Sequence, residues 1–143
     1  MNNVFIRPFK KEDLGAVGTI EPNLVEFSDA MQQSIEDSGL AVTGTVNGVP
    51  IACGGVHPID DFHGEIWLRL NEWCLRNKKD TLLFLREATQ VIENEYPFKQ
   101  LNVTVKADFK QSVKLVEFLG YERVQEAEHK NQKYYCYAKR VQE

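Results

Sequence analysis

Residues 101–121, LNVTVKADFKQSVKLVEFLGY, decide the fold prediction because two different periodicities meet in them. Apolar residues alternate along the first part, at Leu101, Val103 and Val105. They recur at helical spacing along the second part, at Phe109, Val113 and Val116. Alternation indicates a strand, the wider spacing indicates a helix, and Gly120 suits the left-handed position that ends a helix. The stretch therefore predicts a strand followed by a helix.

Upstream of this stretch, the pattern predicts a helix and three strands. Asp80 or Thr81 can cap a helix that runs to about Glu95, where Tyr96-Pro97 stops it. Alternation predicts a strand over Glu65–Leu70. Asn47-Gly48 lies between the apolar runs Leu40–Val46 and Val49–Val56, and this dipeptide favours a type I′ hairpin turn because both central positions need a positive φ.

The two ends of the chain complete the predicted order. Residues 4–6 predict a short strand, and residues 10–25 carry helix signals that Pro22 interrupts. A second helix is expected between a Ser28 cap and Gly39. At the C-terminus, residues 121–124 and 134–138 predict paired strands around a polar loop over residues 125–133. The predicted order is β-α-α-β-β-β-α-β-α-β-β.

Composition bounds the classes of function. The chain has 143 residues, of which 43% are hydrophobic and 27% charged, which predicts one globular domain over 1–143 rather than a disordered chain. A net charge of −4 argues against a broad nucleic-acid surface, and no apolar run reaches the ~20 residues that span a bilayer. Neither a nucleic acid nor a membrane is expected as a partner, and a cytoplasmic location is expected.

Cysteine and histidine spacing does not indicate a metal. Cys53, Cys74 and Cys136 are widely spaced and odd in number, which favours buried thiols over a disulfide framework. His57 and His63 flank a pair of aspartates, but neither helical spacing nor a second ligand pair accompanies them. No metal site is predicted.

The order of elements and the 103–121 stretch resemble the GNAT superfamily of acetyl-coenzyme A dependent N-acetyltransferases. Proteins of this family often carry a strand, an Asn-led helix and an ending Ala-x-x-x-Tyr-x-x-x-Gly-Phe, to which Val103–Ala107 and Phe109–Tyr121 correspond. The resemblance spans essentially the whole chain and implies an α/β (α+β) fold with a mixed central sheet flanked by helices. A narrower resemblance, which includes Glu65-Ile66-Trp67-Leu68, is to short GNAT-like proteins of tailed bacteriophages, some labelled acetyltransferases and others internal virion proteins.

The resemblance implies acetyl-CoA as cofactor and a pyrophosphate loop of the form Gln/Arg-x-x-Gly-x-Gly/Ala. In this sequence the loop corresponds to Arg76, Asn77, Lys78, Lys79, Asp80 and Thr81. Ser112, on the last predicted helix, is a further candidate for cofactor binding. Lys79 and Thr81 replace the two glycines, which permit close backbone approach in the family. The basic residues could offset phosphate charge while Thr81 and the next amides donate hydrogen bonds, or the segment is a solvated basic turn.

The resemblance also implies a general base and a general acid. Glu65 and Glu72 are the candidate bases beside the central strand, with His57 as a third, and both carboxylates could instead be ordinary surface groups. The family's tyrosine acid falls on Val116, so Tyr121 or Tyr134 would have to replace it. Several acidic residues fall in the first two predicted helices: Glu21, Glu26, Asp29, Glu36 and Asp37. Their charge suits binding of an amine acceptor, or they form ordinary solvated helix surfaces.

Two functions follow from the resemblance. The first is transfer of an acetyl group from acetyl-CoA to an unidentified small-molecule or protein amine. The second is a catalytically inactive GNAT-like phage structural or accessory protein, located in the host cytoplasm or the virion. The loss of both loop glycines and Val116 favour the second, whereas Arg76 and the basic loop favour the first. A homodimer is an open prediction for either.

Overall fold

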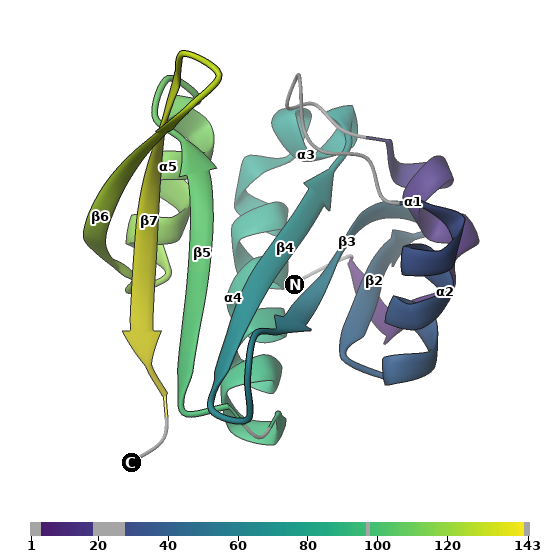
Figure 1. The fold of residues 1–143 in the computed structure, drawn as a ribbon. Helices are drawn as coiled ribbons and strands as arrows, with labels where there is room; N and C mark the ends of the chain where they lie inside the picture. Colours follow the sequence, from purple (N-terminus) through teal and green to yellow (C-terminus); the bar gives the residue numbers. More distant parts are fainter. Residues whose placement is uncertain (1–3, 19–27, 97, 142–143) are drawn as a thin grey trace. The chain divides into compact units, whose positions relative to one another are not determined.

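The computed structural model describes residues 4–18, 28–96 and 98–141. Two compact units divide the chain: the first is Met1–Val56 with Trp67–Ile92, and the second is His57–Ile66 with Glu93–Glu143. The strands form a mixed seven-stranded sheet in the order β1-β2-β3-β4-β5-β7-β6 (Figure 1). The prediction of a single domain is not tested by this division and stays a prediction.

Among its described residues, the first unit holds β1, β2, most of β3, the end of β4, α1, α2, α3 and most of α4. Their bounds are β1 Phe5–Pro8, α1 Glu12–Val17, α2 Asp29–Ser38, β2 Ala41–Val46, β3 Val49–Pro58, β4 His63–Leu70, α3 Glu72–Arg76 and α4 Lys78–Glu95. Three local predictions are confirmed. Asn47 and Gly48 have φ values of 53° and 81° in the β2–β3 turn, and the Ser28 hydroxyl accepts a hydrogen bond from the N–H of Met31 at 3.2 Å. Gly39 ends α2 with a φ of 71°.

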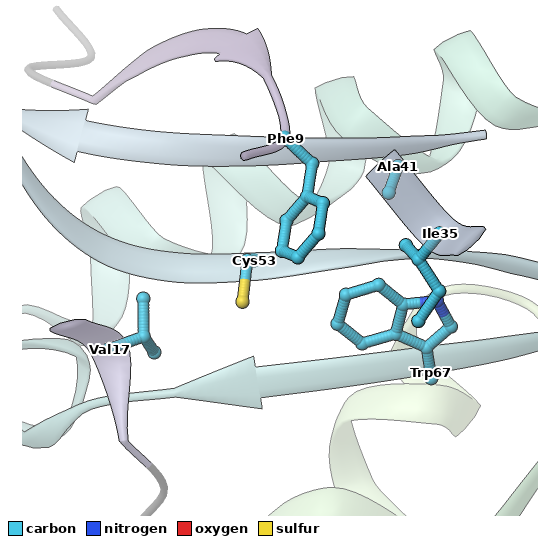
Figure 2. Packing of buried hydrophobic residues seen from close by; sticks show 6 residues of the cluster. All are labelled: Phe9, Val17, Ile35, Ala41, Cys53 and Trp67. Carbon is cyan, nitrogen blue, oxygen red and sulfur yellow. The ribbon is translucent and has the colours of Figure 1, made fainter. Parts of the chain in front are cut away.

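Helices cover both faces of the strands in the first unit. On one face, α1 and α2 close over a buried cluster made of Phe9, Val17, Ile35, Ala41, Cys53 and Trp67 (Figure 2). The rings of Phe9 and Trp67 meet edge to face, with centroids 5.7 Å apart. On the other face, α4 packs so closely that a Cβ at Gly44 would lie 2.7 Å from the ring of Phe84. Gly44 is therefore required for this helix to approach the sheet.

A buried carboxylate joins three elements of the first unit. Asp13 of α1 is only 3% exposed. Its two oxygens accept hydrogen bonds from both terminal nitrogens of Arg7 in β1, each at 2.8 Å, and from the hydroxyl of Thr43 in β2 at 2.7 Å. The N–H of Lys10 donates a fourth, at 2.8 Å. Burial alone would raise the pKa of Asp13, but these hydrogen bonds and the charge of Arg7 hold that pKa below its ordinary value.

The second unit holds the start of β4, together with β5 Gln100–Lys106, α5 Lys110–Phe118, β6 Glu122–His129 and β7 Gln132–Arg140. β4 and β5 are parallel neighbours, because His63, Gly64 and Glu65 pair in parallel with Gln100, Leu101 and Asn102. β5 and β6 each pair antiparallel with β7. Helix α5 covers one face of β5 and β7 (Figure 1), where the hydroxyl of Tyr137 donates to Glu117 at 2.8 Å.

Several predicted boundaries were wrong. The expected loop over residues 125–133 is instead the outer part of a β6–β7 hairpin, whose turn has positive φ values at Lys130 and Asn131. β6 is an edge strand with every residue exposed, so it needs no apolar face to be a strand. β4 begins at His63 rather than at residue 65, and an additional short helix, α3, precedes α4. Residues 19–27, including Pro22, Glu21 and Glu26, lie outside the described residues.

Candidate functional site

The segment predicted as a phosphate loop is mostly helical. Arg76 is the last residue of α3, and α4 begins at Lys78, so only Asn77 lies between the two helices. The prediction that α4 is capped at Asp80 or Thr81 is therefore wrong. The side-chain amide of Asn77 donates to the carbonyl of Trp73 at 2.9 Å, which closes the end of α3 and lets α4 follow at once.

Thr81 faces the interior of the first unit. It is 5% exposed, its hydroxyl donates to the carbonyl of Cys74 at 3.4 Å, and its N–H donates to the carbonyl of Asn77 at 3.0 Å. Both of its hydrogen-bond donors are thus used within the protein. The substitution of a glycine by threonine in the family pattern is accommodated because this side chain points inward.

The start of α4 still offers donors to an anion. The bond from Thr81 to Asn77 is the first of the helix, so the N–H groups of Lys78, Lys79 and Asp80 precede the bonded ladder, where the helix dipole also favours negative charge. The side chains of Lys78 and Lys79 are exposed. The donor set therefore fits a pyrophosphate at this helix start, and the Asp80 carboxylate in the same turn opposes its binding.

Arg76 and Glu72 form a loose pair on α3. The guanidinium and carboxylate are 3.9 Å apart at i,i+4 spacing, and both side chains are largely exposed, at 69% and 81%. Such a pair contributes little to stability, about 0.3–0.5 kcal/mol. Glu72 thus lies on the first turn of a short helix, and its carboxylate is largely exposed to solvent.

Glu65 has a more defined setting in the second unit. Its backbone pairs with Asn102 in the parallel ladder, and its Oε1 accepts a hydrogen bond from the hydroxyl of Thr104 at 3.1 Å. On the same face of β5, the side-chain amide of Gln100 donates to Asn102 at 2.9 Å. The predicted base on β4 therefore lies beside a row of polar side chains on the face of β5 opposite α5.

Sequence reasoning missed this polar row. The strand was predicted from the apolar positions of β5, which are buried, and no role was assigned to the positions between them: Gln100, Asn102, Thr104 and Lys106. Every one of these is polar, and that strict alternation was the available signal. Neighbouring positions of β7 on this face are Ala138, Cys136 and Tyr134, which stand opposite Asn102, Thr104 and Lys106.

Of the three positions considered for a general acid, Val116 and Tyr121 are buried. Val116 is 7% exposed on the inner side of α5, and Tyr121 is 4% exposed. The hydroxyl of Tyr121 has no hydrogen-bond partner in the described part of the chain. Burial raises the pKa of Tyr121, and the nearby charge of Glu93 raises it further. A phenol in this setting holds its proton too firmly to protonate a leaving thiolate readily. Tyr134, which lies on the face of the sheet opposite α5, is half-buried.

The remaining candidates have local partners. Ser112 lies in the first turn of α5, where its N–H donates to the carbonyl of Phe109 at 3.1 Å. His63 binds Asp60 at 2.9 Å inside the β3–β4 turn, while His57 is exposed near the end of β3. On α2, Glu36 accepts from the N–H of Lys11 at 2.9 Å, and Asp37 and Glu36 both accept from the side chain of Gln33. Glu36 and Asp37 thus both form hydrogen bonds to other residues of the first unit.

The described helices include none that is both long and apolar enough to cross a membrane. No protein-family model matches the sequence, and no curated protein matches it either. Solved structures do match over nearly the full length. A GNAT-family acetyltransferase from Streptococcus pneumoniae has a TM-score of 0.76 at 14% identity, and the match covers 96% of this chain and 99% of that one. The fold is that of the GNAT acetyltransferases.

Two further structures with this fold act on different amines. The ribosomal-protein-S18-alanine N-acetyltransferase from Escherichia coli has a TM-score of 0.73 at 16% identity, covering 98% of this chain and 95% of that one. A spermidine N-acetyltransferase chimera, partly from Vibrio cholerae, has a TM-score of 0.74 at 8% identity, with 98% and 97% covered. At such identities the likeness shows the GNAT fold and leaves activity to be argued from the residues.

Proposed function

We propose that the chain is a GNAT-type N-acetyltransferase that transfers an acetyl group from acetyl-CoA to an amine. The observation that carries this proposal is the start of α4, in a chain whose fold is that of acetyltransferases. Lys78, Lys79 and three N–H groups that precede the helical ladder gather there. These groups would hold the pyrophosphate of acetyl-CoA, which supplies the acetyl thioester when bound.

Glu65 is the residue that we assign to proton removal from the amine. Thr104 occupies its Oε1, which leaves Oε2 to accept the proton as the amine nitrogen forms a bond to the acetyl carbon and the carbon–sulfur bond breaks. Because Val116 cannot donate a proton and Tyr121 is buried, the departing thiolate takes its proton from solvent or from Tyr134.

The alternative function is that of a catalytically inactive GNAT-like protein, such as a phage structural or accessory protein. Two observations favour it. Val116 is buried where the family carries its tyrosine acid, and neither loop glycine is present at the α3–α4 junction. Acetyl-CoA binding and acetylation, measured separately, distinguish the two functions.

The experiment compares the wild type with Arg76→Ala/Lys79→Ala in calorimetric titrations with acetyl-CoA. Loss of two charge-assisted contacts should weaken binding by about 1 to 3 kcal/mol, or roughly 5- to 150-fold in Kd. Lys11→Ala is the matched control, because Lys11 is an exposed lysine of the same unit that precedes α1. If the double variant and the wild type bind acetyl-CoA with equal affinity, the start of α4 is not the pyrophosphate site.

Acetylation is measured with two amines chosen from the similar structures, spermidine and a peptide with an N-terminal alanine. We expect turnover of at least one by the wild type and a kcat lower by about 10²- to 10⁴-fold in Glu65→Gln. A wild type that binds acetyl-CoA but acetylates neither amine, or that does not bind acetyl-CoA, supports the inactive alternative.

A further inference from the structure

Among the described residues, the side chain of Thr104 is hydrogen-bonded to the carboxylate of Glu65. Its hydroxyl lies 3.1 Å from Oε1 of Glu65 and donates the hydrogen bond, because an ionised carboxylate can only accept. The two residues come from neighbouring strands that lie side by side at the start of β4 (Figure 1). They are 39 residues apart in sequence, so the contact exists only because the strands pair.

We propose that Thr104 is a positioning residue for the acetyl-transfer reaction and acts by holding the Glu65 carboxylate in the orientation that accepts the amine proton. This inference rests on the proposed function. A free glutamate samples many rotamers and pays entropy to be fixed, whereas a carboxylate anchored through one oxygen presents the other in a defined direction. Thr104 suits this task because its β-branched side chain is stiff at χ1.

The surroundings of the pair support a defined orientation. Thr104 also stands opposite Cys136 in the β5–β7 ladder, and Asn102, beside Glu65, is itself held by Gln100 at 2.9 Å. The backbones of both partners are fixed by hydrogen-bonded ladders, at Glu65 to Asn102 and at Thr104 to Cys136. The hydroxyl therefore reaches the carboxylate from a rigid strand rather than from a loop.

A cross-strand pair of this kind can also be merely structural. Threonine paired across two strands stabilises a sheet by about 0.2 to 1 kcal/mol whatever the protein does. A positioning role predicts a change in kcat that depends on the hydroxyl and on Glu65. A structural role predicts only a change in thermal stability.

The experiment measures acetylation of spermidine and of the N-terminal alanine peptide by the wild type, Thr104→Val, Thr104→Ser and Glu65→Gln. Valine keeps the shape of threonine and removes the donor, so we expect kcat to fall about 3- to 10-fold while KM for acetyl-CoA stays unchanged. Serine keeps the donor and should stay within about twofold of the wild type. Gln125→Ala is the control, because Gln125 is an exposed residue on the same face beyond β7.

The double variant Thr104→Val/Glu65→Gln completes the test. If Thr104 acts through Glu65, the double variant should be no slower than Glu65→Gln alone. The inference is overturned if Thr104→Val keeps the wild-type kcat while Glu65→Gln is impaired, or if the two losses multiply. A wild type without activity overturns both the proposed function and the positioning role. An active wild type with unchanged kcat in Thr104→Val overturns the positioning role alone, so the wild-type rate distinguishes the two failures.

Discussion

Replacing Asp13 with asparagine should destabilise the protein by about 2 to 4 kcal/mol. The side chain is 3% exposed and accepts four hydrogen bonds, two of them from Arg7. Asparagine keeps the volume, but its NH₂ group is a donor that would face other donors, and it lacks the negative charge. Breaking a buried ion pair costs about 3 to 5 kcal/mol. We expect a smaller loss, because the Arg7 side chain is 33% exposed and can return to water.

The assay is equilibrium unfolding in urea, followed by circular dichroism. The midpoint of Asp13→Asn should fall while the slope with urea stays the same. Asp37→Asn is the matched control, because Asp37 is exposed on α2 and accepts a hydrogen bond from the side chain of Gln33 at 2.9 Å. Its midpoint should correspond to a change within about 0.5 kcal/mol. An Asp13→Asn protein as stable as this control would refute the reasoning.

The stability difference between the wild type and Asp13→Asn should also depend on pH. The pKa of Asp13 is lower in the folded protein than in the unfolded chain, so its contribution to stability is complete above the ordinary carboxyl value of about 3.9. The contribution declines as the pH falls from there through the folded-state pKa. The stability difference between wild type and Asp13→Asn should therefore be constant near neutral pH and shrink below about pH 4. A difference that grows on acidification would contradict the assignment.

Two further predictions concern the interior. Burial raises the pKa of the Cys53 thiol to about 12, so a thiol reagent near neutral pH should label Cys136 first and Cys53 only after unfolding, as mass spectrometry of labelled peptides can show. Gly44→Ala should destabilise by about 1 to 3 kcal/mol, because the new methyl group meets the ring of Phe84. In contrast, Gly15→Ala, on a helix with open space around the new Cβ, should stabilise by about 0.4 to 1 kcal/mol in the same thermal melts.

Local sequence signals predicted the features that depend on single backbone positions. Asn47-Gly48, the Ser28 cap and Gly39 each impose a conformation on their own few residues, and each is found where it was expected. The junction of α3 and α4 could not be predicted in this way. Asn77 ends α3 by bonding to a carbonyl four residues back, and α4 starts at the next residue, Lys78.

The β6–β7 hairpin shows a different limit. Strand prediction relies on an apolar face, and β6 has none because all of its residues are exposed at the edge of the sheet. Its charged residues instead fit the common protection of an edge against pairing with another chain. Arg123 lies over the ring of Tyr135 at 3.6 Å, so the strand is held through β7 rather than through a core of its own.

The setting of Glu65 depends on register, which a local pattern does not contain. A slip of β5 by one residue would place Val103 or Val105 beside the carboxylate and turn Thr104 toward α5. Leu101, Val103 and Val105 are all buried, so such a slip would expose three apolar side chains and bury polar ones. The alternation that predicted the strand therefore also decides which hydroxyl stands next to Glu65, once the parallel pairing with β4 is known.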